Sequence, residues 1–475
     1  MLQCKDNRAR LGRRRPEYIA AMRSRGCATA TLEENRMSRL PIRPASSSPL
    51  QKGDDSNPGL PDAMPPRRRF LRSTSALLGA AAAVPAAEAR GAADASPPAI
   101  PESMKVPGAP VGDKLYGVPS KYESGVIRNV PKGAPQYISA ASRTPLGDLD
   151  GIITPSGLFY ERHHGGVPTI DPAEHRLMLH GMVRKPLLFT VDELRRLPSV
   201  SRIHFLECSG NPVYTKPYGK SASDLVGLVS CGEWTGVSVK LLLDEAGLMP
   251  GAKWVLAEGA DAAGMTRSIP IEKCLDDAVV VYSQNGERLR PEQGYPLRLL
   301  VPGFEGNMNV KWLRRLKVMD APAYSREETS KYTDLLPSGK AREFTFYMEA
   351  KSMITSPSGE QKIPSPGFVE IRGIAWSGHG KITRVDVSVD GGRNWSQAAL
   401  QEPVLTRALV RFRHPWRWDG QPTVIMSRAT DETGYVQPTF EQLTAERGVN
   451  SFYHNNAIQP WRVAASGEVT NANNG

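Results

Sequence analysis

Short apolar runs alternate with polar residues through the middle of the chain. Alternation with a period of two is typical of half-buried strands, whereas apolar residues spaced by three and four indicate amphipathic helices. One helix is predicted to begin after Thr190, because Glu193 three residues later completes the pattern of a capping box. We predict strands at 176–179, 202–206, 251–257, 278–282 and 297–301, and helices at 191–196 and 239–246.

The pattern changes at about residue 346. Strand-like runs are then separated by turn signals such as Asp390-Gly391-Gly392, a spacing that indicates a small immunoglobulin-like β-sandwich. The predicted strands are 369–375, 381–389, 408–414 and 423–429. We interpret Trp376, Trp395, Trp416 and Trp418 as core and edge aromatics of this sandwich. The fold class predicted is α+β, followed by the sandwich.

The composition divides the chain further. Residues 90–140 are rich in Pro, Gly and Ala and are expected to form an extended arm. The predicted order is 1–63, a disordered extension or a mis-assigned start; 64–89, a signal peptide; 90–140, the arm; 141–320, the central α+β domain; 321–345, a polar linker crossing the surface; and 346–466, the sandwich.

The signal peptide is predicted from residues 67–89. The run Arg67-Arg68-Arg69-Phe70-Leu71-Arg72 has the pattern of a twin-arginine signal, and an apolar run and Ala87-Glu88-Ala89 follow it. The apolar run is far shorter than the roughly 20 residues that cross a membrane. We therefore expect export in the folded state to the periplasm, translation starting at Met64 or Met37, and no membrane span.

The formal charge of +11 first suggests an anionic partner such as nucleic acid. Residues 1–90, however, hold 17 Lys and Arg against 8 Asp and Glu, so the remainder carries only +2. A nucleic-acid-binding domain needs a basic face on its folded part. We expect no nucleic-acid partner.

Five cysteines are present, two of them in the leader. The other three, Cys208, Cys231 and Cys274, are odd in number and have no paired spacing, which argues against a disulfide framework. No Cys-x-x-Cys-His occurs, so we expect no c-type haem in this chain.

Cys208 stands between an apolar strand and the turn Gly210-Asn211. It could be a nucleophile, a metal ligand or an inert core residue. A nucleophile needs a histidine base, but His204 lies four residues back on the same strand and is not expected to reach the sulfur. Glu207 would raise the thiol pKa unless a cation or metal intervenes, whereas metal coordination deprotonates a thiol outright. We favour the metal ligand.

Three further clusters carry polar chemistry. Arg162-His163-His164 before a Gly-Gly turn suits an anion, although a solvated loop remains open. Asp261 could accept hydrogen bonds from a polar heterocycle or simply belong to a turn. Arg298 and Lys311 bracket a Pro-Gly loop whose amides could cradle an oxyanion, but the loop lacks the Gly-Lys-Ser/Thr of a P-loop.

Together these clusters resemble the sulfite oxidase family of molybdopterin enzymes over residues 140–465. The resemblance is carried by Cys-x-Gly-Asn, Glu-Gly-x-Asp with Ser-Ile-Pro, the run from Tyr295 to Trp312, and Val436-Gln437-Pro438. Within the family, residues 162–164, 331–334 and 351–357 are most similar to the SoxC group, the molybdenum subunits of sulfane dehydrogenases.

The resemblance implies a molybdenum-molybdopterin cofactor, with Cys208 as the metal ligand. It further implies that the cofactor or its phosphate is bound by Arg162, His164, Asp261, Arg298 and Lys311. Catalytic roles would fall to Cys208, Arg162, Arg447 and an active-site tyrosine, for which Tyr332 is our candidate. The sandwich would be a dimerisation domain.

Two departures bear on the substrate. Where sulfite oxidases have arginines, this chain has Pro212-Val213, and the substrate-pocket tryptophan of the family falls near Asp224. A pocket with less positive charge fits a sulfane carried on a protein better than free sulfite.

We therefore expect a periplasmic enzyme that oxidises carrier-bound sulfane or sulfite and passes electrons to a c-type cytochrome. We expect a homodimer of this chain within a hetero-oligomer, with a sulfur-carrier protein as a possible substrate. One alternative is a molybdenum methionine-sulfoxide reductase, but those relatives typically lack the sandwich. The other is a non-enzymatic exported binding module, which binding without metal would favour.

Overall fold

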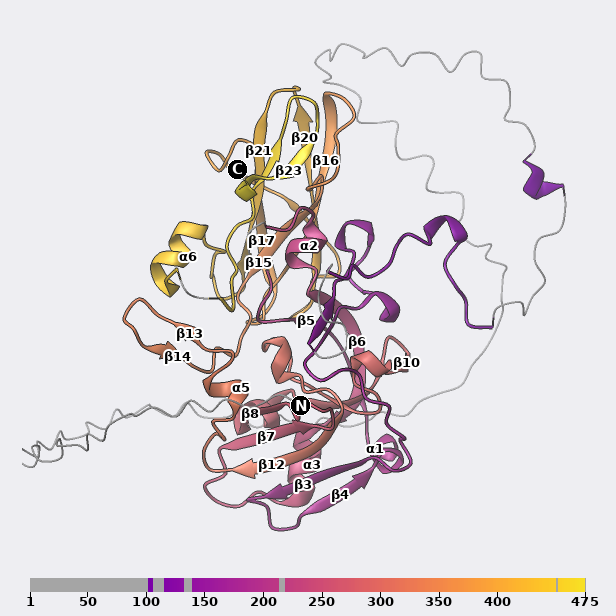
Figure 1. Ribbon diagram of the computed structural model, residues 1–475, viewed down its shortest axis with the longest axis vertical. Coiled ribbons are helices and arrows are strands. Elements are labelled where there is room, and N and C mark those ends of the chain that lie inside the picture. Colours follow the sequence, from indigo (N-terminus) through magenta and orange to yellow (C-terminus); the bar gives the residue numbers. More distant parts are fainter. Residues whose placement is uncertain (1–100, 106–114, 132–138, 213–217, 450–451, 475) are drawn as a thin grey trace, which may run out of the picture. The chain divides into compact units, whose positions relative to one another are not determined.

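The computed structural model describes residues 101–105, 115–131, 139–212, 218–449 and 452–474 (Figure 1). The chain divides into two compact units, Met1–Gly108 and Ala109–Gly475. Of the first unit only 101–105 are described, with a short 3-10 helix at Glu102–Met104. The predicted signal peptide lies outside the described residues. No helix in the described part is long and apolar enough to span a bilayer.

One five-stranded sheet of the second unit has the order β4-β3-β12-β7-β8. Figure 1 shows β4, β3, β12 and β7 side by side, with β12 parallel to β3 and antiparallel to β7. Leu313, Leu316 and Val318 of β12 are buried and alternate with less buried residues, as expected for a strand with one face in a core. The strands are β3 (Arg176–Gly181), β4 (Leu187–Thr190), β7 (Trp254–Gly259), β8 (Thr266–Pro270) and β12 (Leu313–Met319).

A second sheet has the order β10-β9-β6-β5, with β11 also paired to β9. Its strands are β5 (Val200–Glu207), β6 (Val229–Ser238), β9 (Val279–Gln284), β10 (Glu287–Arg288) and β11 (Arg298–Leu300). β5 ends at Glu207, so Cys208 is the first residue beyond the sheet. Arg298 is the first residue of β11. This sheet therefore delivers two of the predicted site residues at strand ends. A separate two-stranded sheet pairs β1 (Ala140–Ser142) with β2 (Glu161–His163).

The helices of this region are short and amphipathic. α1 (Val191–Arg196) and α3 (Val239–Ala246) have the predicted bounds. Thr190 and Glu193 form the predicted capping box, in which the Glu193 amide donates to Thr190 Oγ1 at 3.1 Å. In α3 the residues at 239, 242, 243 and 246 are buried on one face. The other helices are α2 (Ala222–Val226), α4 (Ile271–Asp276), α5 (Arg326–Thr329) and α6 (Phe440–Arg447).

The predicted sandwich is present, as a four-stranded and a five-stranded sheet with orders β15-β16-β20-β19 and β18-β17-β21-β22-β23. The strands are β15 (Lys351–Ser356), β16 (Gly367–Trp376), β17 (Ile382–Ser388), β18 (Ser396–Gln397), β19 (Ala399–Gln401), β20 (Val410–Trp418), β21 (Thr423–Asp431), β22 (Trp461–Val463) and β23 (Val469–Asn471). Trp376 and Trp418 are buried, as predicted for core aromatics.

The segment 321–345 is more than the polar surface linker that its composition indicated. It contains α5 and the two-stranded pair β13 (Asp334–Leu335) and β14 (Ala341–Arg342). Glu328 of α5 is buried and accepts hydrogen bonds from Ser268 Oγ at 3.2 Å and from the Ser325 amide at 3.1 Å. Buried polar groups need such partners, and these contacts attach the segment to β8.

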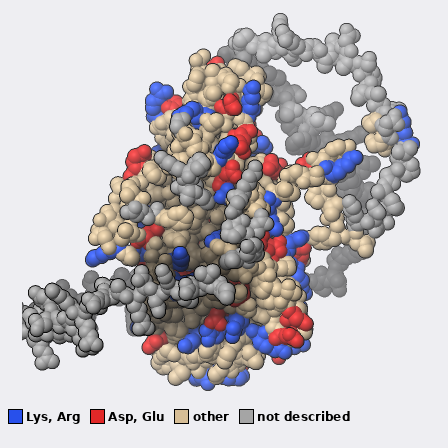
Figure 2. All heavy atoms as spheres, viewed as in Figure 1, with Lys and Arg blue, Asp and Glu red and all other residues tan. Residues whose placement is uncertain are grey.

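One hydrophobic core joins the central region to the sandwich. Phe205 of β5 and Val226 of α2 pack in the same buried cluster as Trp376 and Phe412 of the sandwich. The Phe205 amide also donates to the Arg407 carbonyl at 3.0 Å. A second core lies around the β4-β3-β12-β7-β8 sheet. Lys and Arg are interspersed with Asp and Glu on the face seen in Figure 2, as expected from a basic excess that lies mostly within residues 1–90.

Candidate active site

β5 ends at a cavity that Cys208 enters from one side. The Cys208 amide donates to the Leu228 carbonyl at 3.0 Å and the Asn211 amide to the Cys208 carbonyl at 2.9 Å, so residues 208–211 form a tight turn. Cys208 is partly exposed here. The space measures about 670 Å³ when its open mouth is included. Its lining is Phe159, Tyr160, Arg162, His163, His164, Leu206, Cys208, Asp261, Met265, Gln293, Arg298, Gly306, Asn307, Asn309, Val310, Lys311, Trp312 and Tyr332.

Seven of the eight predicted site residues line this one cavity, although they are spread over 170 positions of the sequence. They are Arg162, His164, Cys208, Asp261, Arg298, Lys311 and Tyr332. Separate elements supply them: β2, the ends of β5 and β7, the start of β11, the residue pair before β12, and the segment between α5 and β13. Convergence of polar groups from several elements on one concave space is typical of a binding site.

Arg298 is buried, and none of the described carboxylates forms an ion pair with it. Its guanidinium donates to the backbone carbonyls of Gln293 at 2.9 Å and Asn309 at 3.2 Å and lies over the ring of Trp234. Its Nε has no hydrogen-bond partner among the described residues. Burial lowers the pKa of Arg298 to about 10. A buried cation without a carboxylate is costly, so this one indicates a place for an anionic group.

Lys311 lies directly beside Arg298, to which it is joined by an isolated antiparallel bridge. Its Nζ donates to the Glu292 carbonyl at 2.9 Å and lies 4.5 Å from the centre of the Trp312 ring. Burial, and then the charge of Arg298, lower the pKa of Lys311 to about 7. Two adjacent cations that donate to backbone carbonyls favour a multiply charged anion such as a phosphate.

A chain of hydrogen bonds connects Arg162, His164 and Tyr332 in the cavity. Arg162 Nη2 lies 3.4 Å from His164 Nδ1, and His164 Nε2 lies 2.8 Å from the Tyr332 hydroxyl. Because arginine can only donate, Nδ1 accepts and Nε2 carries the proton that Tyr332 accepts. The Tyr332 hydroxyl hydrogen is then free for another partner in the cavity.

The protonation states agree with that arrangement. Burial and the charge of Arg162 lower the pKa of His164 to about 4, so its ring is neutral at neutral pH. Burial raises the pKa of Tyr332 well above the usual value, so its hydroxyl stays protonated. Arg162 remains a fixed cation, and its other contacts are to Ser139 Oγ and to backbone carbonyls.

Asp261 and Gly306 shape the other walls. Asp261 follows β7 and accepts a long contact of 3.5 Å from the Met265 amide, which leaves acceptor capacity at the carboxylate. A Cβ at Gly306 would lie 2.7 Å from the Glu207 carbonyl oxygen and 2.9 Å from the Tyr160 hydroxyl. Only glycine permits that close approach of the loop to the end of β5.

The electrostatics of Cys208 do not favour a free nucleophile. Burial raises the pKa of its thiol, and the nearby charge of Arg162 only partly opposes the shift. His204 lies outside the cavity, where its Nδ1 is 3.3 Å from the Arg407 carbonyl. His204 therefore cannot act as the base for this thiol, whereas a soft metal would deprotonate it by coordination.

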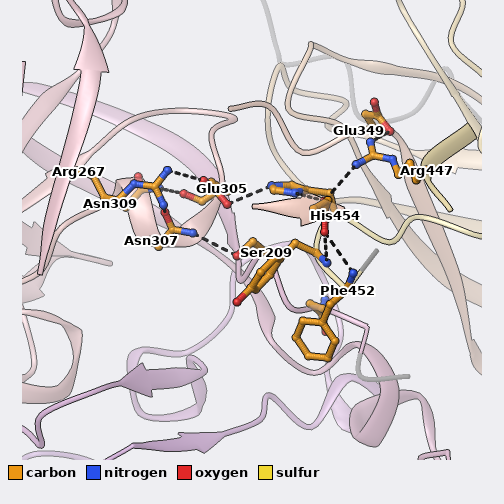
Figure 3. A network of polar contacts seen from close by, with 12 residues as sticks. Ser209, Arg267, Glu305, Asn307, Asn309, Glu349, Arg447, Phe452 and His454 are labelled. Carbon is orange, nitrogen blue, oxygen red and sulfur yellow. Dashed lines mark hydrogen bonds and ion pairs between the residues drawn. The ribbon is translucent and has the colours of Figure 1, made fainter. Parts of the chain in front are cut away.

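A buried network of ions lies next to the cysteine turn (Figure 3). Arg267 Nη2 donates to Glu305 Oε1 at 2.9 Å, and His454 Nε2 lies 3.0 Å from Glu305 Oε2. Asn307 Nδ2 donates to Ser209 Oγ at 3.1 Å, and the His454 amide to the Ser209 carbonyl at 2.8 Å. The residue after the cysteine is therefore held by both halves of the molecule.

Arg447 is the predicted site residue that does not line the cavity. It lies in the network just described, where Nη2 donates to Glu349 at 2.9 Å and Nη1 is 4.0 Å from Asp334 (Figure 3). These two carboxylates hold the Arg447 side chain in the buried network, away from the cavity wall. Asp224 also lies elsewhere, in the capping box at the start of α2. Val213 lies outside the described residues.

Several lining residues escaped the sequence analysis. Tyr160 stands two positions before Arg162, and Asn307 and Asn309 belong to the Gly-Asn-Met-Asn loop. Tyrosine and asparagine are frequent in ordinary loops, so composition gave no reason to select them. Their proximity in sequence to Arg162 and Lys311 was the available signal.

Two family models match the chain in succession. The oxidoreductase molybdopterin binding domain matches residues 164–327, and the Mo-co oxidoreductase dimerisation domain matches residues 342–460. Sulfite oxidase of Gallus gallus is 31% identical over 325 residues, a match that covers 60% of this chain and 68% of that protein.

The chain belongs to the sulfite oxidase family of molybdopterin oxidoreductases. Among solved structures, the sulfane dehydrogenase SoxCD of Paracoccus pantotrophus is 46% identical with a TM-score of 0.76, and the match covers 79% of this chain and 99% of that one. Other relatives are longer: the match covers 59% of the mitochondrial sulfite oxidase of Drosophila melanogaster, at 32% identity and 64% of this chain. It covers 37% of the NADH nitrate reductase of Solanum lycopersicum, at 33% identity and 62% of this chain.

The cavity of this family member fits a molybdopterin. Cys208 would supply a soft thiolate at one side, and Arg298 and Lys311 would supply positive charge for the phosphate. The Arg298 Nε has no hydrogen-bond partner among the described residues. The free acceptor capacity of Asp261 suits the pterin ring. Arg162 and His164 line the same cavity, where the sequence resemblance implies that they bind the cofactor or its phosphate.

Proposed function

We propose that this protein is a periplasmic molybdenum oxidoreductase that oxidises reduced sulfur, with carrier-bound sulfane as the favoured substrate and sulfite as the second. The observation that carries the proposal is the cavity itself, where the Cys208 thiol, fixed cations and a hydrogen-bonding tyrosine converge. The 46% identity to sulfane dehydrogenase SoxCD supports sulfane over the nitrate chemistry of the more distant relatives.

The residues of the chain have distinct tasks in this reaction. The bound molybdenum centre supplies two-electron oxidation with oxygen transfer to sulfur. Arg162 provides a fixed positive charge for the oxygens that the product sulfur gains. Tyr332, held by His164 Nε2, keeps its hydroxyl proton and donates it as a hydrogen bond to the substrate or product. Arg298 and Lys311 would hold the cofactor phosphate.

The substrate preference rests on the turn after the cysteine. Sulfite oxidases have arginines directly after the Gly-Asn turn, where this chain has Pro212. Of the arginines predicted to bind substrate, Arg162 is the only one that lines the described part of the cavity. One fixed cation suits a thiol-linked sulfane with little charge better than a small dianion, which gains more from several cations.

The proposal also includes the cell compartment and the partners. The arginine cluster at 67–72 supports export of the folded protein through the twin-arginine pathway. The matched dimerisation domain supports a homodimer. A separate c-type cytochrome would accept the electrons, because this sequence contains no Cys-x-x-Cys-His motif for a haem of its own. A sulfur-carrier protein would present the substrate at the cavity mouth.

Metal analysis tests the proposal first. The protein, expressed in a host that makes molybdopterin, is expected to hold one molybdenum per chain, and absence of the metal would refute the proposal. Cys208→Ser is expected to keep the fold and lose the sulfur-to-metal charge-transfer absorption. Steady-state oxidation of sulfite and of a sulfur-loaded carrier, each with cytochrome c, then distinguishes the two substrates. Nitrate reduction without sulfur oxidation would instead favour the nitrate reductase branch.

A further inference from the structure

Glu207, the residue before Cys208, is a carboxylate with no exposure to solvent. It accepts three hydrogen bonds: from Trp376 Nε1 at 2.7 Å, from Asn211 Nδ2 at 2.9 Å and from Lys351 Nζ at 2.5 Å. A buried charge is tolerated when it is paired and fully hydrogen-bonded, and here both conditions are met. Glu207 therefore has a fixed position and cannot rotate without breaking charged hydrogen bonds.

Two of these donors belong to the sandwich, and they come from one cross-strand pair. Lys351 begins β15 and Trp376 ends β16, and the two residues lie opposite each other in the antiparallel register. Residues so placed have neighbouring side chains on one face of a sheet. The rigid edge of the sandwich thus directs a cation and an indole N–H at the same carboxylate, 144 and 169 positions away in sequence.

Lys351 also binds the far end of the cysteine turn. Its Nζ donates to the Asn211 carbonyl at 2.9 Å, while the Asn211 side chain bonds Glu207 and the Val226 carbonyl. The lysine is nearly inaccessible, with 2% exposure. One ammonium group therefore ties residue 207 to residue 211 and closes the turn that holds Cys208 between them.

We propose that Lys351 and Trp376 of the sandwich are positioning residues that set the orientation of the Cys208 sulfur in the cavity. They act through Glu207 and Asn211 and do not line the cavity themselves. The C-terminal domain is in this way a structural part of the metal site, in addition to any role in dimerisation. The proposal concerns the thiol itself, and only its metal-loaded test rests on the function proposed above.

The first test measures the thiol in cofactor-free protein. Trp376→Phe removes one hydrogen-bond donor and keeps an aromatic ring, and Lys351→Met removes the cation and keeps an unbranched chain. We expect both variants to react several-fold faster than the wild type with iodoacetamide at Cys208, followed by peptide mapping, because the freed turn exposes the sulfur more often. The buried Cys231 and Cys274 report on general loosening and are expected to stay unmodified.

Two matched controls carry the same substitutions elsewhere. Lys273→Met removes a buried lysine whose Nζ donates to Asp277 Oδ2 at 2.9 Å. Trp418→Phe removes a buried indole donor bonded to the Gln421 carbonyl at 2.9 Å in the same sandwich. Both are expected to leave the reactivity of Cys208 at the wild-type value. Equal rates in the test and control variants would overturn the proposal, and so would modification of Cys231 and Cys274 together with Cys208.

The second test uses the molybdenum-loaded protein. Trp376→Phe is expected to shift the sulfur-to-metal charge-transfer band and the reduction potential of the metal, because both depend on the angle at the sulfur, while Trp418→Phe leaves them unchanged. An unshifted band and potential in Trp376→Phe would contradict the positioning role. If the wild type itself binds no molybdenum, the proposed function fails, and the alkylation rates still decide whether the sandwich positions Cys208.

Discussion

In the cofactor-free cavity, the amine of Lys311 is protonated only in part at neutral pH. Burial and the neighbouring Arg298 lower its pKa to about 7, and the carboxylates of Glu161, Asp261 and Glu292 oppose this shift only in part. A lowered lysine pKa means that the charged form is present below about pH 7 and is lost above it. An anion bound beside Lys311 stabilises the charged form in return.

Anion binding by the cofactor-free protein should therefore weaken as pH rises through about 7. Sulfate is a suitable probe because its own charge does not change in this range, and calorimetric titration at pH 6 and pH 8.5 measures the affinity. We expect tighter binding at pH 6. Lys311→Met should bind sulfate weakly at both pH values, and a pH dependence that persists in this variant would assign it to another group.

The Tyr332 hydroxyl is the second single group with a measurable role. Tyr332→Phe removes the partner of His164 Nε2 and the donor to the substrate, while the ring keeps its place below Arg267. We expect kcat/KM to fall by roughly 10²-fold, the size found when one positioned donor is removed, with unchanged molybdenum content. Tyr282→Phe, at a buried tyrosine of β9 that does not line the cavity, is the control and should retain activity.

The sequence alone could predict those cavity residues that are chemically unusual. Cys208, Arg162, Arg298 and Lys311 stand out because each is a thiol or a cation close to a glycine turn, a placement that suits a binding site. Arg447 stood out for the same reason but lies in a buried ion network with Glu349. A sequence shows which residues are neighbours along the chain. It does not show that Glu349, 98 positions away, neutralises the charge of Arg447.

At the scale of elements, the buried imidazole of His454 lies beside two carboxylates, Glu305 and Asp334, that come from different segments. Glu305 comes from the loop after β11, and Asp334 begins β13. Burial alone would lower the pKa of His454, but these two carboxylates outweigh it and the pKa is raised, with Arg447 opposing them. The ion pair thus connects three segments that are far apart in sequence.

A raised histidine pKa contributes stability that is complete below the unfolded value of about 6.5 and is lost as pH rises through the folded value. The wild type should therefore exceed His454→Gln in free energy of unfolding by the largest amount near pH 5.5, and the difference should shrink toward pH 8.5. Urea titrations across that range measure it. A difference that grows with pH would mean that His454 is neutral in the folded protein.

The elements themselves could be predicted well wherever a local pattern determines them. The helices α1 and α3 have the predicted bounds because capping and apolar spacing are local properties. The pair β13 and β14 was missed because its sequence is polar and each strand has two residues. Its place depends on Asp334, which accepts hydrogen bonds from the amides of Phe452 and Tyr453, and such long-range contacts leave no local signal.

At the scale of the whole molecule, the central region and the sandwich share one core. Phe205 of β5 packs in the same cluster as Trp376 and Phe412. Elements that share a core unfold together, because neither part keeps its buried surface when the other opens. We therefore expect the parts before and after residue 345 to unfold in one cooperative transition, although the sequence pattern changes there.

Phe205→Ala tests this directly. Removing the ring from a closed core should cost about 3–5 kcal/mol. We expect scanning calorimetry to show one transition for residues 109–475 in both proteins, at a lower temperature in the variant. Two transitions, of which only the first moves, would show that the regions unfold independently.

The three described thiols differ in how well they compete for a soft metal. Burial raises the pKa of Cys231 to about 12 and that of Cys274 further still, and neither sulfur is accessible. At neutral pH they present almost no thiolate and no path for a large ligand. In the folded chain, Cys231 and Cys274 therefore do not compete with Cys208 for a soft metal. Under the export proposed above, the same burial would keep these two thiols from forming wrong disulfides.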